Sequence, residues 1–248
     1  MSGPPWLRPV SLAQACAALQ QGYTPVGGGV ALASASFPLT IGPYALDLSG
    51  LGVDYREGSI CGAQLTLEDA LQDHVFRQQW PAVWEAIAAT GTPEVRRLAT
   101  FGGTVGAALP TSDLLTALCA HDAELEYAEP TGARWWMPLL TYLADPPVAL
   151  VLGIDLGPPR PGCFRRFAGR AGFAPAVASV AAVGYEDGIH LWAGAVAATP
   201  LPLEQAALPE ELALRHDEQY SAWFRRRILA CLRDEALAAL PTPRALTN

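Results

Sequence analysis

The stretch "ATFGGTVGAALPTSD", residues Ala99–Asp113, places two adjacent glycines between a strand-like and a helix-like segment. Backbone N–H groups approach a phosphate closely only where Cβ atoms are absent, and a cluster of such N–H groups binds anions. The pair Gly102 and Gly103 therefore predicts either a simple turn of the chain or a phosphate-binding loop. The rest of the sequence has to decide between the two.

A second glycine run, "PVGGGVALA" at Pro25–Ala33, also follows a predicted strand. Asp47 ends the next predicted strand about 20 residues later, where a Rossmann fold carries its ribose-binding acid. The Rossmann interpretation fails because Leu32 occupies the third glycine position. Pro38 and the Gly42–Pro43 pair also interrupt the required crossover helix. Taken alone, this run favours a turn.

The charged residues argue against several classes of function. All 16 basic residues are arginine, so the chain has neither a phosphate-loop lysine nor an amine for Schiff-base chemistry. The formal net charge of −8 argues against nucleic acid as a partner, because phosphate binding favours a basic surface. Two glycine motifs without a lysine suit a flavin dinucleotide that is held mainly by backbone groups.

The cysteines, histidines and apolar stretches exclude further classes. The five cysteines are widely separated, which excludes CxxC ligand sets for zinc or iron–sulfur clusters and predicts reduced, mostly buried thiols. The four histidines are scattered, so no metal site is expected. The N-terminus lacks the order of a signal peptide, and no apolar stretch is long enough to span a bilayer. We therefore expect a cytoplasmic protein without a membrane span.

Periodicity and capping residues predict alternating helices and strands in both halves of the chain. A hairpin is expected at residues 123–139, and a Pro/Gly-rich segment at 157–162 marks a domain boundary. Two strands at 174–197 follow this boundary. Helices are expected at residues 11–22, 66–72, 80–91, 113–122, 203–208 and 221–240.

The motifs resemble those of the FAD-binding medium subunit of molybdenum hydroxylases, the carbon-monoxide dehydrogenase and xanthine dehydrogenase flavoprotein family. "GGGVAL" at Gly27–Leu32 resembles the family's "AGGTDL", and Val95–Asp113 resembles "VRNxATIGGNIAxxSPxxD". In the C-terminal part, residues 164–170 resemble "YxKxxRR" and residues 221–230 resemble "SAxYRRxLA". The motifs occur in the same order over nearly the whole chain.

This resemblance implies an α+β fold with a two-subdomain FAD-binding domain of the PCMH type, at residues 1–58 and 59–160. A smaller domain at residues 161–248, with a helix on an antiparallel sheet, would follow. The implied activity is that of an oxidoreductase subunit. Electrons would pass from iron–sulfur clusters to non-covalent FAD and then to NAD or another acceptor. A large molybdopterin-binding subunit and a small [2Fe-2S] subunit would be the partners.

The resemblance also implies the cofactor-binding residues. Two motifs would lie along the FAD diphosphate, and three further residues would lie near the sugar-like chain and the flavin ring. The first motif comprises Val26, Gly27, Gly28, Gly29, Val30 and Ala31, and the second comprises Thr100, Phe101, Gly102, Gly103 and Thr104. The three further residues are Asp113, Leu152 and Arg166, and no catalytic side chain or metal ligand is implied.

Three positions depart from the family pattern. Val30 and Ala31 stand where the family has a polar pair, and Thr104 stands where it has asparagine. Each lost side-chain hydrogen bond removes about 0.5–1.5 kcal/mol of binding free energy. Two alternatives therefore stay open. One is a subunit that keeps the fold for assembly without FAD, and the other is a stand-alone flavin oxidase, against which the C-terminal motifs argue.

Other noticeable side chains have ordinary structural interpretations. We expect His121–Glu124 to be exposed to solvent between a helix and a strand. Trp135 and Trp136 predict core packing of the hairpin. Arg225–Arg227 predict a solvated face of the last helix.

Overall fold

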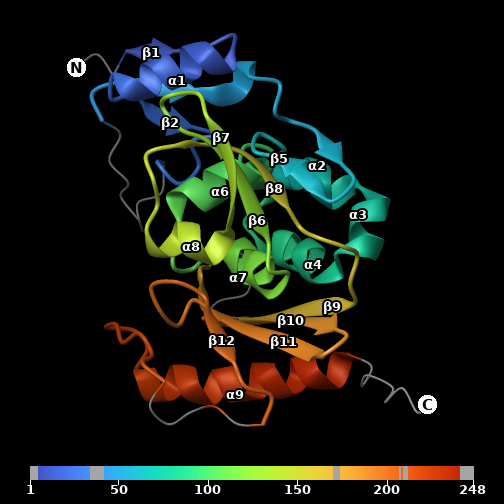
Figure 1. Cartoon of the computed structure of the whole chain (residues 1–248). Coiled ribbons are helices and arrows are strands. Elements are labelled where there is room, and N and C mark those ends of the chain that lie inside the picture. The colour runs from blue at the N-terminus through green and yellow to red at the C-terminus, as the bar shows by residue number, and fades with distance from the viewer. Residues whose placement is uncertain (1–4, 34–41, 170–173, 207, 209–211, 241–248) are drawn as a thin grey trace. The chain divides into compact units, whose positions relative to one another are not determined.

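The computed structural model of the chain (Figure 1) describes residues 5–33, 42–169, 174–206, 208 and 212–240. The chain divides into two compact units, each of which is described below by itself. The first unit comprises Met1–Gln72, Thr92–Ala108 and Asp122–Gly157, and the second comprises Asp73–Gly91, Leu109–His121 and Pro158–Asn248. Helices and strands alternate in both units, which confirms the predicted α+β class.

The first unit contains a small parallel sheet in the order β1-β3-β2. Its strands are β1 (Trp6–Leu7), β2 (Thr24–Val26) and β3 (Ala45–Asp47), and the 3-10 helix η1 (Leu48–Gly50) follows β3. Helix α1 (Leu12–Gln20) begins as predicted, because Ser11 Oγ accepts a hydrogen bond from Gln14 N at 3.3 Å. Its buried residues Cys16 and Leu19 share a core with Leu46 of β3.

The larger sheet of this unit is antiparallel in the order β4-β5-β8-β6-β7. Its strands are β4 (Arg56–Glu57), β5 (Ile60–Gly62), β6 (Glu124–Ala128), β7 (Arg134–Pro138) and β8 (Leu150–Asp155). The predicted hairpin is confirmed as the antiparallel pair β6–β7. The helices of this unit are α2 (Leu67–Gln72), α5 (Pro93–Arg96), α6 (Phe101–Ala107) and α8 (Leu139–Ala144). Helix α6 packs against β5 and β8.

The second unit is built on an antiparallel sheet in the order β12-β11-β10-β9. The strands are β9 (Gly162–Ala168), β10 (Ala176–Tyr185), β11 (Gly188–Gly194) and β12 (Leu201–Leu203). The helices are α3 (His74–Gln79), α4 (Pro81–Ala89), α7 (Asp113–Ala120) and α9 (Ala222–Ala239). Figure 1 shows α9 against one face of this sheet and α4 and α7 against the other, which confirms the predicted helix on an antiparallel sheet.

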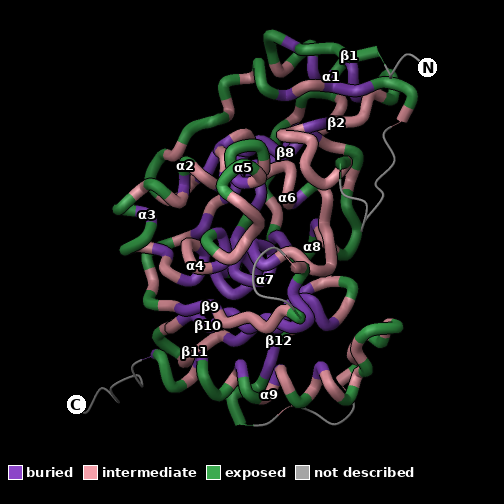
Figure 2. Tube along the Cα trace, turned by 180° about the vertical axis from the view of Figure 1, so that it is seen from behind, coloured by how far each residue is buried: buried purple, intermediate pink, exposed green. Residues whose placement is uncertain are grey.

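Side-chain alternation explains why this sheet is covered on both faces. Val180 and Ala182 of β10 lie in one core with Leu229 and Leu232 of α9. On the opposite face, a Cβ added at Gly194 would lie 1.8 Å from Thr116 Oγ1 of α7, so a glycine is required there. Strand β10 and helix α7 are buried for most of their length, as Figure 2 shows.

Two predictions of secondary structure are wrong. The segment before Gly102 is the short helix α5 and an extended link, rather than a strand, and the glycine pair lies inside the first turn of α6. The predicted helix at residues 203–208 is also absent from its described part, since Leu203 ends β12 and the chain bends at Gln205 and Ala206. Tertiary pairing of β12 with β11 overrides the local helix propensity there.

Predictions of exposure are wrong at several residues, whereas Asp122, Glu124 and Arg227 are exposed as expected. His121 is buried rather than solvent-exposed, and Trp135 and Trp136 are half exposed on the edge strand β7 rather than packed in the core. Arg225 is buried, and its guanidinium donates hydrogen bonds to Val177 O and Ala195 O. This residue therefore fixes α9 to the sheet instead of lying on a solvated face.

The cysteines follow the sequence analysis more closely. Four of the five are buried, Cys231 is exposed, and none of them forms a disulfide. Within the described ranges, no helix is both long enough and apolar enough to cross a membrane.

Candidate functional site

In the part of the chain that the structure describes, no acceptor is present for a row of backbone donors in the first glycine motif. Residues Gly27–Ala31 follow β2 as bends and a turn, with Gly29 at φ +72°. Their amide N–H groups donate no hydrogen bond to any residue that the structure describes. Consecutive free amides in a partly exposed turn form a concave anion-binding surface.

The second motif is different, because its amides are already used by the fold. Four consecutive N–H groups donate to other groups of the first unit. The bonds join Phe101 N to Leu65 O (3.1 Å), Gly102 N to Ala63 O (2.8 Å), Gly103 N to Thr100 Oγ1 (3.0 Å) and Thr104 N to Thr100 O (2.9 Å). The hydroxyl of Thr104 also donates to Thr100 O at 2.9 Å. This motif therefore supplies a rigid support rather than a set of free donors.

The structure brings the two motifs together. A Cβ added at Gly103 would lie 3.9 Å from Gly27 Cα and 4.0 Å from Gly28 N. A Cβ added at Gly27 would lie 2.6 Å from Thr100 Oγ1 and 3.4 Å from Gly103 Cα. The glycines thus allow two backbone segments, far apart in the sequence, to touch without intervening side chains.

Gly102 has a separate reason to be glycine. A Cβ at this position would lie 2.6 Å from Ala63 Cβ and 2.9 Å from Ala63 O, so it would displace α6 from the end of β5. The hydrogen bond from Ala63 N to Leu152 O, at 2.9 Å, continues this contact to β8. Helix packing therefore accounts for Gly102, while contact with the first motif accounts for Gly103.

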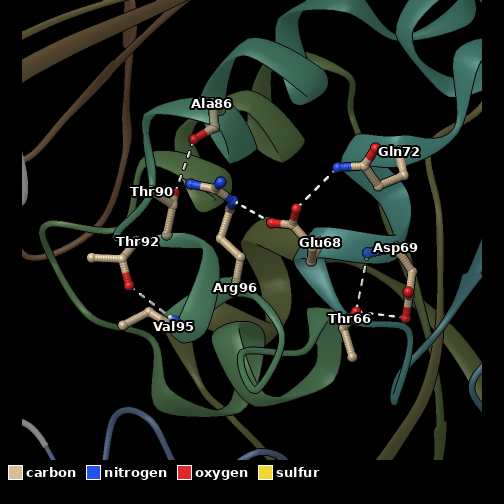
Figure 3. A network of polar contacts seen from close by, with 9 residues as sticks. All are labelled: Thr66, Glu68, Asp69, Gln72, Ala86, Thr90, Thr92, Val95 and Arg96. Carbon is tan, nitrogen blue, oxygen red and sulfur yellow. Dashed lines mark hydrogen bonds and ion pairs between the residues drawn. The ribbon is translucent and has the colours of Figure 1, made fainter.

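A buried ion pair fixes the segment that leads into the second motif (Figure 3). Arg96 Nε of α5 lies 2.8 Å from Glu68 Oε2 of α2, and both side chains are largely buried. Glu68 also accepts from Gln72 Nε2 at 3.0 Å, and the hydrogen bond with Arg96 lowers the pKa of the Glu68 carboxyl. One residue before the motif, Ala99 O accepts from Leu67 N at 2.9 Å. The pair therefore holds α5 and α2 together where the chain enters α6.

The second unit holds two further candidates as a pair. Asp113 stands at the start of α7, and its buried Oδ2 lies 3.3 Å from Arg166 Nε of β9. Burial raises the pKa of Asp113 to about 7, although the charge of Arg166 acts in the opposite direction. Arg166 also donates to Ala89 O at 2.6 Å and to Ala174 O at 2.7 Å. Asp113 Oδ1 is buried and has no hydrogen-bond partner among the described residues.

Three of the candidates serve mainly as core residues. The side chains of Val26, Phe101 and Leu152 are almost completely buried. Leu152 belongs to the cluster beneath α1. Within the described ranges, no group of three or more His, Cys, Asp or Glu side chains is arranged to hold a metal ion.

The side-chain amide of Gln64, which is not among the predicted site residues, lies at the contact of the two motifs. Its Nε2 would be 3.5 Å from a Cβ at Gly27, and this atom is buried without a partner among the described residues. Gln64 lies outside both glycine motifs, so no sequence signal marked it.

Both glycine motifs lie within the part of the chain that matches a known protein family. Residues 1–152 match the family model described as "FAD binding domain in molybdopterin dehydrogenase". The xanthine dehydrogenase FAD-binding subunit of Escherichia coli O157:H7 is 28% identical over 81 residues, which are 32% of this chain. The aligned region covers only 28% of that curated relative's length.

The structural similarity extends further than the sequence similarity. A chain of reconstituted CO dehydrogenase from Oligotropha carboxidovorans superimposes with a TM-score of 0.83 at 20% identity, covering 96% of this chain and 97% of that chain. A chain of quinoline 2-oxidoreductase from Pseudomonas putida 86 gives a TM-score of 0.82 at 17% identity, with the same coverage of both chains. At these identities the superpositions establish a shared fold.

Proposed function

Since the chain belongs to the family of FAD-binding domains of molybdopterin dehydrogenases, we propose that it is the FAD-binding, electron-transferring subunit of a molybdopterin-dependent oxidoreductase. Family membership confirms the resemblance of the motifs. The observation that carries the proposal is the row of amides at Gly27–Ala31, which have no acceptor among the described residues and lie beside the second motif. Such a row of amides binds a diphosphate without the help of a lysine, and this chain contains no lysine.

In this proposal each candidate residue has a limited task. A bound flavin supplies the redox chemistry, as cofactors do in such enzymes. Gly27–Ala31 hold the diphosphate, while Thr100–Thr104 support that loop from behind. Asp113 Oδ1, for which the described residues offer no partner, accepts from a cofactor hydroxyl, and Arg166 keeps that carboxylate oriented.

The proposal predicts reversible, non-covalent binding. No histidine or cysteine lies in either glycine motif to form a flavin tether. Titration of the purified chain should quench FAD fluorescence, ADP should compete because it carries the same diphosphate, and denaturation should release all of the flavin. A chain that neither binds FAD nor takes up ADP would contradict the proposal.

The apolar residues at positions 30 and 31 predict a modest affinity. The double variant Val30→Thr/Ala31→Ser restores two neutral polar side chains, so it should bind FAD about threefold to tenfold more tightly per hydrogen bond gained. Gly106→Ala, at an open position of α6, serves as the control. An unchanged affinity would mean that these two side chains do not face the cofactor.

The proposed partners are a large molybdopterin-binding subunit and a small iron–sulfur subunit, and NAD or another acceptor would receive the electrons. The chain has no clustered cysteines for an iron–sulfur centre, so the electron donor has to come from another subunit. Purification of the tagged chain from its native host should recover both partners. Recovery of the chain alone would contradict the assembly.

A second candidate is a family member that keeps the fold for assembly without FAD. The specific observations in its favour are the apolar side chains of Val30 and Ala31 and the internal use of the Thr104 hydroxyl. The two candidates differ in one measurement. An assembly subunit without FAD would co-purify with the same partner subunits. The purified complex would then show no flavin absorbance from this chain.

A further inference from the structure

Gln64 is held in place by its backbone but not by its side chain. It lies two residues after the end of β5, and Gln64 N donates to Val53 O at 2.8 Å. Its neighbours are also fixed, since Ala63 N donates to Leu152 O at 2.9 Å and Leu65 N to Gly62 O at 3.0 Å. The side-chain atom Nε2 is nevertheless buried without a hydrogen-bond partner among the described residues. A buried unpaired amide donor is unfavourable and calls for an explanation.

The location of this amide supplies an explanation. The position that a Cβ would take at Gly27 lies 3.5 Å from Gln64 Nε2, 2.6 Å from Thr100 Oγ1 and 3.4 Å from Gly103 Cα. The unpaired donor therefore lies where the two glycine motifs meet. The amides of the first motif have no acceptor within the described ranges, while those of the second motif are already bonded.

Resting on the proposed function, we propose that the Gln64 amide donates a hydrogen bond to the diphosphate of the bound dinucleotide. The Gln64 residue is only partly buried, so a change of side-chain rotamer carries Nε2 from its enclosed position to a phosphate oxygen. A hydrogen bond from a neutral amide to an anion is stronger than one between neutral groups. Gln64 thereby replaces donors that Val30, Ala31 and Thr104 do not provide.

This role predicts that a substitution of Gln64 has opposite effects on the stability of the free protein and on cofactor binding. If Gln64 binds the cofactor, its donor is unsatisfied in the free protein and satisfied in the complex. Removing the amide should then stabilise the free protein while weakening the complex. A merely structural glutamine would show the reverse in the free protein, because its removal would lower stability.

The test compares Gln64→Met, which preserves side-chain length without hydrogen-bonding groups, with wild type. The control is Gln78→Met on the exposed surface of α3. For Gln64→Met we expect a rise of about 2–4 °C in the melting temperature of the flavin-free protein. We also expect about tenfold weaker binding of FAD. The binding of ADP should weaken by the same factor, because the lost contact is with the diphosphate that ADP and FAD share.

Gln64→Glu provides a second variant of similar shape. Its carboxylate would repel the diphosphate, so FAD binding should weaken further than in Gln64→Met and recover partly at high salt. The inference is overturned if both variants bind FAD within twofold of wild type, or if Gln64→Met lowers stability and affinity together. Absence of FAD and ADP binding by wild type would instead refute the proposed function itself.

Discussion

The carbonyl oxygen of Leu98 lies directly against the α-carbon of Gly28. A Cβ added at Gly28 would be 1.4 Å from Leu98 O and 2.4 Å from Leu98 C. Both atoms belong to the backbone, so no side-chain rearrangement relieves the overlap. The backbone of Leu98, just before the second motif, therefore packs directly on Gly28 of the first motif. Position 28 has to be glycine for this contact to form.

Gly28→Ala should consequently destabilise the first unit. We expect a loss of about 1–3 kcal/mol, as in other overpacked sites, because the loop or the Leu98 segment has to move. Thermal unfolding measures the effect. The control is Gly106→Ala, at a helix position with open space around it, which should stabilise the protein by about 0.5–1 kcal/mol. An equal stability of both variants would contradict the contact.

Gly103→Val should abolish flavin binding while the protein stays folded. Its Cβ would lie 2.8 Å from Thr100 Oγ1, so the larger side chain has to project toward Gly27 and Gly28. Fluorescence titration with FAD measures binding, and circular dichroism checks the fold. Gly106→Val on the same helix should bind FAD normally. Retention of FAD by Gly103→Val would mean that the first motif does not hold the diphosphate.

Arg96→Met should be strongly destabilising because it leaves the Glu68 carboxylate largely buried without its cationic partner. Loss of one partner of a buried pair typically costs about 3–5 kcal/mol. Chemical denaturation provides the measurement. Arg97, which is exposed next to it, offers the control Arg97→Met, for which we expect a change within about 0.5 kcal/mol.

The same pair predicts a pH dependence. The hydrogen bond with Arg96 lowers the pKa of Glu68, so the stabilisation is present above the ordinary glutamate pKa of 4.5 and is lost as the pH falls below it. Glu68→Gln should reduce this acid sensitivity. If the stability of Glu68→Gln fell in parallel with that of wild type between pH 5 and about pH 3, the Glu68–Arg96 pair would not be the source of this acid sensitivity.

His121→Leu should stabilise the protein. Both ring nitrogens are buried without a partner among the described residues, and burial lowers the pKa of His121 to about 3. We expect a gain of about 1 kcal/mol near neutral pH, since an apolar side chain leaves no unsatisfied group. The exposed residue His74 supplies the control His74→Leu.

The pH profile of His121→Leu provides a further check. The unfolded chain takes up a proton near the ordinary histidine pKa of 6.5, whereas the folded protein does so near 3. Wild-type stability therefore falls as the pH decreases through this interval, and the variant should lack that contribution. An advantage of the variant that does not grow toward low pH would contradict the burial.

Asp113→Asn should show the opposite dependence. Burial raises the pKa of Asp113 from 3.8 to about 7, so its contribution to stability is fully present below the unfolded value and is lost as the pH rises through the folded value. Relative to wild type, the variant should become more stable between pH 4 and about pH 7. Asp145→Asn, at an exposed position, should show no such trend.

Local features of the fold could be predicted from the sequence. Ser11 caps α1, Pro81 begins α4, and the turn before Gly132 closes the β6–β7 hairpin. Each of these depends on residues a few positions apart, so the pattern carries the information. The family resemblance, and with it the fold, also rested on short motifs that needed no knowledge of their spatial arrangement.

The tertiary structure alone decided what the buried polar groups and the glycines do. The contacts of Gly28 with Leu98, of Gly102 with Ala63 and of Asp113 with Arg166 join residues that are distant in the sequence. The burial of His121 depends on its surroundings in the second unit. Burial and close backbone approach result from the packing of distant segments. The free energy of a glycine or a charge therefore depends on neighbours that no local pattern specifies.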